Sequence, residues 1–264
     1  MTQKFFVRSL SVFALCAGLS LTACGGAAGQ DDDQEDANAS MAQSSAVEYM
    51  ITNPINSADP ATAATNLQAA TQWWPAGCVT RQKDPTNPIV TLTLNNCTGP
   101  FGLMKWSGTV TVTFQKNADG TLKASAVSKD MTANGNPATF TMERNITITP
   151  GTTTRDVKGT TTWSRVSARG VQVNHTSAWA ATIDSSTRCR TVNGAGTTTA
   201  GAVTVATTAK DYKVCRPAGI DQCPTGTLTH TAAGNTVTIS FDGSNMATVT
   251  GPRGTRQVGL VCGQ

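Results

Sequence analysis

The stretch TVTVTF, residues 109–114, alternates hydroxyl and apolar side chains without exception. Successive side chains of a strand point to opposite faces, so this alternation predicts a β-strand with one apolar and one polar face. The same period of two recurs at residues 90–94, 146–149, 236–241 and 258–262. Strands of this kind are typical of an antiparallel sheet that packs one face on a core.

Tight-turn dipeptides lie between the alternating segments and predict type I′ hairpins, in which both central residues have a positive φ. They are Asp119-Gly120, Asn134-Gly135, Asn193-Gly194 and Asp242-Gly243. We count roughly ten to twelve strands, and no alternation of strands with helices indicates a parallel sheet. We therefore predict a mainly β fold, an antiparallel meander that forms a barrel or a curved half-barrel with a short N-terminal helical segment on its concave face. A two-sheet β-sandwich is the alternative, and a solenoid ranks third because no repeat of fixed period is found.

Composition supports this fold class. Hydrophobic residues make up 39% of the 264 residues, which is enough for a core, while charged residues make up only 14%. About 45 residues are threonine, a residue that favours strands. This composition excludes collagen, a coiled coil, a helical bundle and a multi-span membrane protein.

The net charge of +4 hides an uneven distribution. Removing Lys4, Arg8 and the five acids of residues 31–36 from the 20 basic and 16 acidic residues leaves 18 basic and 11 acidic residues, a net charge of +7. The basic residues are scattered and few aromatic residues lie among them, so we interpret them as a solvated surface and predict no nucleic-acid partner.

The first 23 residues have the pattern of a secretion signal, with Lys4 and Arg8 followed by a short apolar stretch. The segment ends in Leu21-Thr22-Ala23-Cys24, which resembles the lipobox of bacterial lipoproteins. The resemblance covers about 24 residues and implies that Cys24 receives a diacylglycerol and an N-acyl chain after cleavage. Two or more acyl chains hold a protein stably on a bilayer. Gly25 follows Cys24, which by the same resemblance implies the outer membrane, with the periplasmic or surface face left open.

Beyond Cys24 we predict three regions. Residues 24–44 carry the lipidated cysteine and a flexible acidic tether, residues 45–77 a helical segment, and residues 78–264 the β domain. Ser45 and Glu48 have the spacing of a capping box for a short first helix that ends at Pro54. A second helix is predicted from an Asp59 cap through an apolar stripe of Ala63, Leu67, Ala70 and Trp74, ending at Pro75.

Six cysteines remain after the signal segment and Cys24, and an even number in an oxidising compartment predicts three disulfides. We expect a bond between Cys78 and Cys97. The other four allow 189–215 with 223–262, or 215–223 with 189–262. No CxxC motif is present and the two histidines lie far from any cysteine in sequence, so we predict neither a metal site nor a cofactor. The six predicted disulfide cysteines are Cys78, Cys97, Cys189, Cys215, Cys223 and Cys262.

The alternation of side chains places three polar residues on the apolar face of their strands, where they could line an interior cavity that orients a ligand. They are His175, His230 and Arg144. The alternatives are that the two histidines are hydrogen-bonded core residues and that Arg144 reaches solvent at a strand end. The tryptophans, including Trp163 and Trp179, are interpreted as core residues.

Enzyme signatures such as GxSxG, HExxH, SxxK and a Walker loop are missing, so we predict no catalytic residues and no enzyme. Beyond the lipobox no characterised family is recognised. The first functional hypothesis is a non-enzymatic cell-envelope lipoprotein, a tethered binding or scaffold module held on the membrane through Cys24, with an envelope protein as partner. The alternative is a carrier of an apolar ligand or lipid in a curved β sheet, and a hydrolase with an unrecognised site ranks third.

Overall fold

The computed structural model describes residues 51–70, 75–98, 105–149, 151–167, 169–215, 222–260 and 262. The predicted signal peptide, lipidation site and acidic tether lie outside these residues, as do most of the predicted first helix and Trp73 and Trp74. Ile51 and Thr52, at the end of that predicted helix, are helical, and a turn follows at Asn53 and Pro54.

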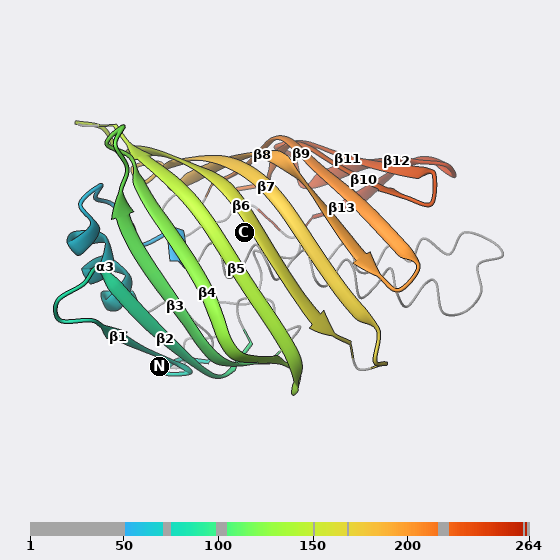
Figure 1. Cartoon of the computed structure of the whole chain (residues 1–264). Helices are drawn as coiled ribbons and strands as arrows, with labels where there is room; N and C mark the ends of the chain where they lie inside the picture. The colour runs from blue at the N-terminus through green and yellow to red at the C-terminus, as the bar shows by residue number, and fades with distance from the viewer. Residues whose placement is uncertain are drawn as a thin grey trace, which may run out of the picture.

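The described strands form a single antiparallel sheet in which every strand pairs with its neighbour in sequence (Figure 1). The first and last strands are not paired with each other, so the sheet is an open, curved half-barrel. This confirms the predicted meander and excludes the sandwich, which would need two sheets. The 13 strands are β1 (Val79–Lys83), β2 (Ile89–Cys97), β3 (Trp106–Lys116), β4 (Leu122–Ala133), β5 (Asn136–Ile148), β6 (Thr154–Val166), β7 (Gln172–Asp184), β8 (Cys189–Ala200), β9 (Val203–Cys215), β10 (Thr225–Ala232), β11 (Asn235–Asp242), β12 (Met246–Gly251) and β13 (Gly254–Gly259).

The two faces of the sheet differ as the alternation predicts. In β3, Val110, Val112 and Phe114 are fully buried, whereas Thr111 between them is exposed. The apolar side chains point into the curve of the sheet, where burial of apolar surface supplies most of the stabilisation. The threonines point out to the convex face, where their branched side chains suit a strand and their hydroxyls stay in water.

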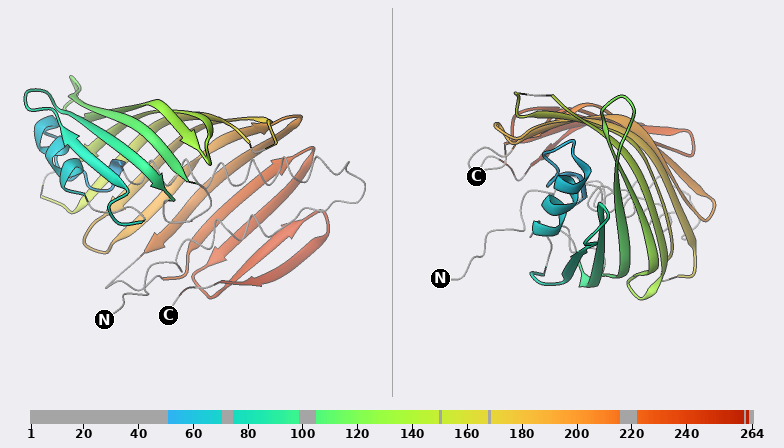
Figure 2. Two further views of the ribbon diagram at one scale, coloured as in Figure 1. Left: turned by 90° about the horizontal axis from the view of Figure 1, so that it is seen from below. Right: turned by 60° about the vertical axis from the view of Figure 1, so that its left-hand side comes forward.

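The described helix, α3 (Pro60–Ala69), lies inside the curve against β1, β2 and β3 (Figure 2). Asp59 caps it as predicted, because its side chain accepts a hydrogen bond from the backbone N–H of Thr62 at 2.8 Å. The predicted continuation through Ala70 toward Trp74 is wrong, since Ala70 is extended. Leu67 is the last buried residue of the helix, so packing does not support a further turn.

Bulges, at which the register between two strands shifts, bend the strands and help to curve the sheet. At the shift between β9 and β10, Asp211 has a φ of 50° and faces Gly226, whose φ is 98°. A Cβ at Gly226 would lie 2.2 Å from the backbone oxygen of Asp211, so no larger residue fits there. A bulge of this kind increases the local twist, and it helps the meander to curl instead of lying flat.

One predicted hairpin is wrong. Asn193-Gly194 lies inside β8, not in a turn. Gly194 faces Trp179, and a Cβ there would come within 2.7 Å of the indole ring, so this glycine makes room for a tryptophan. The other three dipeptides do lie at or between strand ends, but only Asn134-Gly135 has a positive φ at both residues, so the type I′ prediction is wrong for Asp119-Gly120 and Asp242-Gly243.

The concave face holds one large apolar core, a smaller one, and a third small cluster of Val173, Ala200 and Val205. The larger joins α3 with β1 to β5 and the nearer parts of β6 and β7, and includes Ile51 and Ile55 from the segment before the helix. The smaller lies on β9 to β12 and includes Leu228, Ile239 and Phe241. Three disulfides are present, as predicted: Cys78–Cys97 beside the larger core, and Cys189–Cys215 and Cys223–Cys262 in the second half.

Candidate functional site

A band of polar side chains, all buried except the partly exposed His230, crosses the concave face between the larger core and the core on β9 to β12. Its members come from β5 to β10, which lie side by side in the sheet. This band is the candidate site, and we call it the polar band. It consists of Arg144 on β5; Arg155, Thr161, Trp163 and Arg165 on β6; His175 and Ser177 on β7; Thr198 on β8; Thr207 on β9; and His230 on β10.

Arg144 is buried among the apolar residues with which it shares a phase in the sequence, and only 2% of it is exposed. It therefore does not reach solvent, so the alternative in which Arg144 extends to water at a strand end is wrong. Its guanidinium donates to the hydroxyl of Thr161 at 2.7 Å and to the backbone oxygen of Glu143 at 3.1 Å. Gly159 stands opposite Arg144 in the register, and a Cβ there would lie 2.0 Å from the backbone oxygen of Glu143, so β5 and β6 approach each other closely at this point.

Two further arginines, Arg155 and Arg165, are buried at the two ends of β6 and were not predicted. Arg155 donates to the backbone oxygen of Asn53 at 2.7 Å, which ties β6 to the segment before α3. The signal was present in the sequence, because both arginines alternate in phase with Val157 and Trp163. The buried face of β6 was missed because few of its residues are apolar. Along the strand this face reads arginine, valine, glycine, threonine, tryptophan, arginine.

His175 lies at the centre of the band. Its Nδ1 shares a hydrogen bond of 2.8 Å with the hydroxyl of Thr198 directly across on β8. On the other side it faces Trp163, whose ring centre lies 6.3 Å away. Trp163 in turn makes an edge-to-face contact with Trp106, at 6.3 Å, on the side of the larger core. The histidine is therefore a buried, hydrogen-bonded residue at the border between aromatic and polar surface.

His230 repeats this arrangement three strands away. Its Nδ1 shares a hydrogen bond of 3.0 Å with the hydroxyl of Thr207 on β9. Burial lowers the pKa of His230 to about 4, because removal from water penalises the charged imidazolium. At neutral pH the side chain is therefore uncharged, and its threonine partner fits either tautomer.

Among the buried polar atoms of the band, the indole Nε1 of Trp163 and the hydroxyl of Ser177 have no hydrogen-bond partner in the described part of the chain. Both residues are more than nine-tenths buried. An unsatisfied buried polar group costs free energy, so such atoms mark places where a partner is expected. Gly196 lies against Ser177 and His175, and a Cβ there would come within 3.2 Å of the histidine ring, so the band is tightly packed at this point.

The three residues predicted to share a cavity lie on one face but not in one cluster. Arg144, His175 and His230 stand on β5, β7 and β10. With neighbouring strands about 4.8 Å apart, the two histidines are separated by about 14 Å across the sheet. Thr198 and Thr207 lie between them, so the site is an elongated surface across several strands.

The polar band is positively charged. The buried polar residues of the described chain include three arginines and no carboxylate. The described carboxylates lie at turns, caps, bulges and on the convex face; Glu143, for example, points outward and pairs with Lys123 at 2.7 Å. Among the described residues, the buried part of the concave face therefore carries more basic than acidic side chains.

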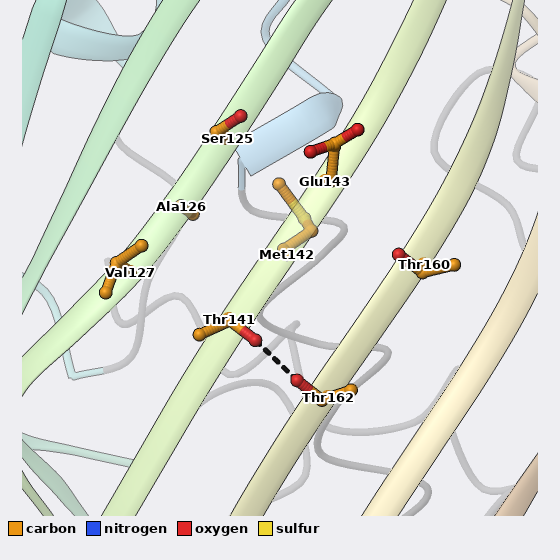
Figure 3. Close-up of a pocket in the computed structure, with 8 residues that line it drawn as sticks. All are labelled: Ser125, Ala126, Val127, Thr141, Met142, Glu143, Thr160 and Thr162. Carbon is orange, nitrogen blue, oxygen red and sulfur yellow. Dashed lines mark hydrogen bonds between the residues drawn. The ribbon is translucent and has the colours of Figure 1, made fainter.

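A groove on the opposite, convex face lies over β4, β5 and β6 (Figure 3). Threonine hydroxyls border it, and Thr141 and Thr162 hydrogen-bond across its floor. Its one charged side chain is Glu143, which is already paired. The groove therefore offers a polar, nearly uncharged surface, and it is separated from the polar band by the sheet itself. Its lining consists of Ser125, Ala126, Val127, Thr141, Met142, Glu143, Thr160 and Thr162.

The residues that the structure describes contain no group of three or more histidine, cysteine or acidic side chains placed to hold a metal ion. Within the same residues, no helix has the length and apolar character needed to span a membrane. No protein-family model matches the chain, and neither the curated proteins nor the solved structures include a match.

Proposed function

We propose that this protein is a non-enzymatic, lipid-anchored module of the bacterial cell envelope, and that its concave face binds an amphipathic molecule with an anionic group. The observation that carries the proposal is the order of surfaces inside the curve. A positive, hydrogen-bonding band lies between two apolar cores. An apolar chain with an acidic end matches that order, because it can bury its chain on a core and place its acid at the arginines.

The chemistry of the band supports a recognition role for the acidic group. Arginine presents a planar fork of donors that suits carboxylate and phosphate oxygens. The free indole N–H of Trp163 and the hydroxyl of Ser177 add two donors on neighbouring strands. A few convergent polar groups in a mainly apolar concave surface are the usual composition of a small-molecule site.

The histidines support binding over catalysis. Each shares its Nδ1 with a threonine hydroxyl, and burial holds the pKa of His230 near 4. A general base at neutral pH works best with a pKa near 7, so His230 is poorly suited to proton transfer. A threonine also does not orient and charge an imidazole as a carboxylate does.

The envelope location rests on the sequence. Acylation of Cys24 would hold the protein on the membrane, and the lipobox resemblance favours the outer membrane. A protein anchored there meets amphipathic molecules at the bilayer surface, which is consistent with the proposed ligand class. Whether the anchored protein faces the periplasm or the exterior does not change the chemistry of the site.

Native mass spectrometry tests the proposal. The full lipidated protein is extracted from the membranes of the source bacterium in a mild detergent, and any non-covalent adduct is released into organic solvent and identified. We expect an acidic, apolar molecule that is lost in Arg165→Gln and retained in Arg256→Gln, a control at an exposed arginine of β13. A protein partner in place of a small molecule would favour the scaffold role, and a bare mass with no partner would contradict the proposal.

A further inference from the structure

We infer that Trp163 and Ser177 form a subsite for an acyl carbonyl oxygen, so that the ligand of the concave face is an ester whose carbonyl lies a few bonds from its acidic group. The position of that acidic group rests on the proposed function. The subsite itself rests on two buried hydrogen-bond donors and on the residues that stand beside them.

The two donors are the first support. The indole Nε1 of Trp163 and the hydroxyl of Ser177 have no hydrogen-bond partner in the described part of the chain, and the two residues are only 4% and 6% exposed. A buried donor without a partner costs free energy, and folded proteins retain few of them. Two such donors on one face of neighbouring strands therefore indicate an acceptor that a ligand supplies.

The register of the strands is the second support, because it brings both donors within reach of one group. Trp163 on β6 stands opposite His175 on β7, and Ser177 lies two residues further along β7 on the same face. The backbones of such diagonal neighbours are about 7–8 Å apart, a distance that an aromatic side chain can bridge. A single ester group can therefore accept hydrogen bonds from both residues.

Small residues on the next strand, β8, are the third support (Figure 1). Gly196 stands directly opposite Ser177, and a Cβ there would lie 3.0 Å from the Cβ of the serine, so a larger residue would crowd it. His175 and Trp179 flank Ser177 on the same face of β7. A serine and a glycine between two flat rings suit a flat, uncharged group better than a bulky, charged one.

The chemistry of the donors selects the kind of acceptor. An indole N–H only donates, and neither an indole nor a hydroxyl carries a charge at neutral pH. A buried acid held by neutral donors alone would keep an uncompensated charge, which is costly. An ester carbonyl accepts hydrogen bonds and carries no charge. An amide carbonyl accepts them too, but its own N–H would need a further buried acceptor, so the ester is the closer match.

The acid and the carbonyl of one ligand can be placed side by side. The guanidinium of Arg144 donates to the hydroxyl of Thr161 at 2.7 Å, and Thr161 stands directly opposite Ser177. Directly opposite side chains lie about 5 Å apart, so Ser177 is one strand away from the group that Arg144 contacts. A monoacyl glycerol phosphate, in which a few bonds separate the phosphate from the ester carbonyl, has the matching order of groups.

A matched pair of lipids tests the subsite. The full lipidated protein in a mild detergent is titrated calorimetrically with oleoyl lysophosphatidate and with its ether analogue, in which a methylene replaces the carbonyl. The phosphate and the chain are the same, so only the carbonyl differs. We expect the ester to bind about tenfold more tightly, which is what two neutral hydrogen bonds contribute together.

The variants remove one donor each and keep the shape of the site. Ser177→Ala and Trp163→Phe should each reduce the preference for the ester, and the double variant should abolish it. An isotope label on the carbonyl carbon gives a second readout, because the infrared stretching frequency of the bound carbonyl should rise when a donor is lost. The controls, Ser240→Ala on the convex face and Trp106→Phe in the larger core, should retain both the preference and the frequency.

The stability of the unliganded protein separates a binding role from a structural one. Ser177→Ala should unfold at the same or a higher urea concentration than the wild type, because it removes an unsatisfied buried hydroxyl. A clear loss of stability would mean that the hydroxyl has a structural partner and would overturn the subsite. Equal binding of the ester and the ether would overturn the subsite alone and leave the proposed function standing, whereas saturable binding of neither lipid would overturn both.

Discussion

The two halves of the sheet use the same strand chemistry but bury their concave faces differently. In the first half, β1 to β5, the segment before α3 and α3 itself cover the apolar side chains, and Leu92, Phe114 and Leu122 are fully buried. In the second half, β8 to β13, no described helix lies over the sheet, and Ile239 and Phe241 retain slight exposure. The first half is thus a core closed by a described helix, while the core of the second half has no described helix over it.

Matched phenylalanines test this contrast and should give the largest effect. Phe114→Ala removes a fully buried ring from the first half and should cost roughly 4 kcal/mol of unfolding free energy. Phe241→Ala removes a ring of the second half, in edge contact with Tyr212 at 5.5 Å, and should cost less. Urea unfolding with the disulfides intact measures both values. Equal losses would mean that the second half is as closely packed as the first.

Removal of each disulfide should destabilise mainly the half of the sheet that contains it. Removal of the Cys223–Cys262 bond through two alanines should cost about 2–4 kcal/mol, because it frees a long loop in the unfolded chain. Hydrogen exchange should then accelerate in β10 to β13 and remain slow in β2 to β4. Removal of the Cys78–Cys97 bond is the control and should produce the opposite pattern. An acceleration throughout the sheet in both variants would show one cooperative unit.

His230 gives the second half a dependence on pH. Its folded pKa of about 4 lies below the value near 6.5 of the unfolded chain, so the unfolded state binds more protons between these values. Stability is therefore complete above pH 6.5 and falls as the pH drops toward 4, by up to about 3 kcal/mol. In His230→Asn this part of the slope should disappear in urea titrations at a series of pH values. An unchanged slope would assign the effect to other groups.

The helix cap should give the smallest effect and confine it to the first half. The side chain of Asp59 accepts hydrogen bonds from the backbone N–H and the hydroxyl of Thr62, and these bonds lower its pKa. Asp59→Ala should lower the urea midpoint slightly and raise hydrogen exchange in α3, because a capping oxygen is lost. Asp59→Asn keeps an oxygen acceptor and should behave like the wild type. A larger loss in Asn than in Ala would contradict the capping role.

The fold could be predicted because strand alternation is a local signal. Each threonine–apolar repeat, such as residues 109–114, specifies its own two faces, and short hairpins leave few ways to connect neighbouring strands. The sequence could not separate a barrel from a half-barrel, since closure depends on the total twist and bulges of the whole sheet. The end of α3 at Ala69 was also missed, because packing on the sheet limits the helix and local propensity does not.

The site could be predicted only in part, since its residues are brought together by the pairing of strands, which the sequence does not specify residue by residue. Arg144, His175 and His230 could be predicted because each is a polar residue at a position where the alternation of the strand calls for an apolar one. Arg155 and Arg165 lie on a strand with little apolar signal, and Ser177 and Thr198 resemble every other hydroxyl residue of the chain. The sequence predicts a turn at Asn193-Gly194, because it does not show that Trp179 lies opposite Gly194 on the neighbouring strand. Such cross-strand neighbours become visible only once the register is known.

The most direct test of the account is whether the concave face distinguishes an anionic from a neutral amphiphile. A brominated fatty acid and the fatty alcohol of the same chain length are titrated against the purified full protein, and quenching of tryptophan fluorescence is followed. The account predicts saturable quenching by the acid, weaker binding of the alcohol, and loss of the difference in Arg165→Gln, because Trp163 and Arg165 lie on one strand face. Equal binding of the two amphiphiles, or no saturable binding of either, would contradict it.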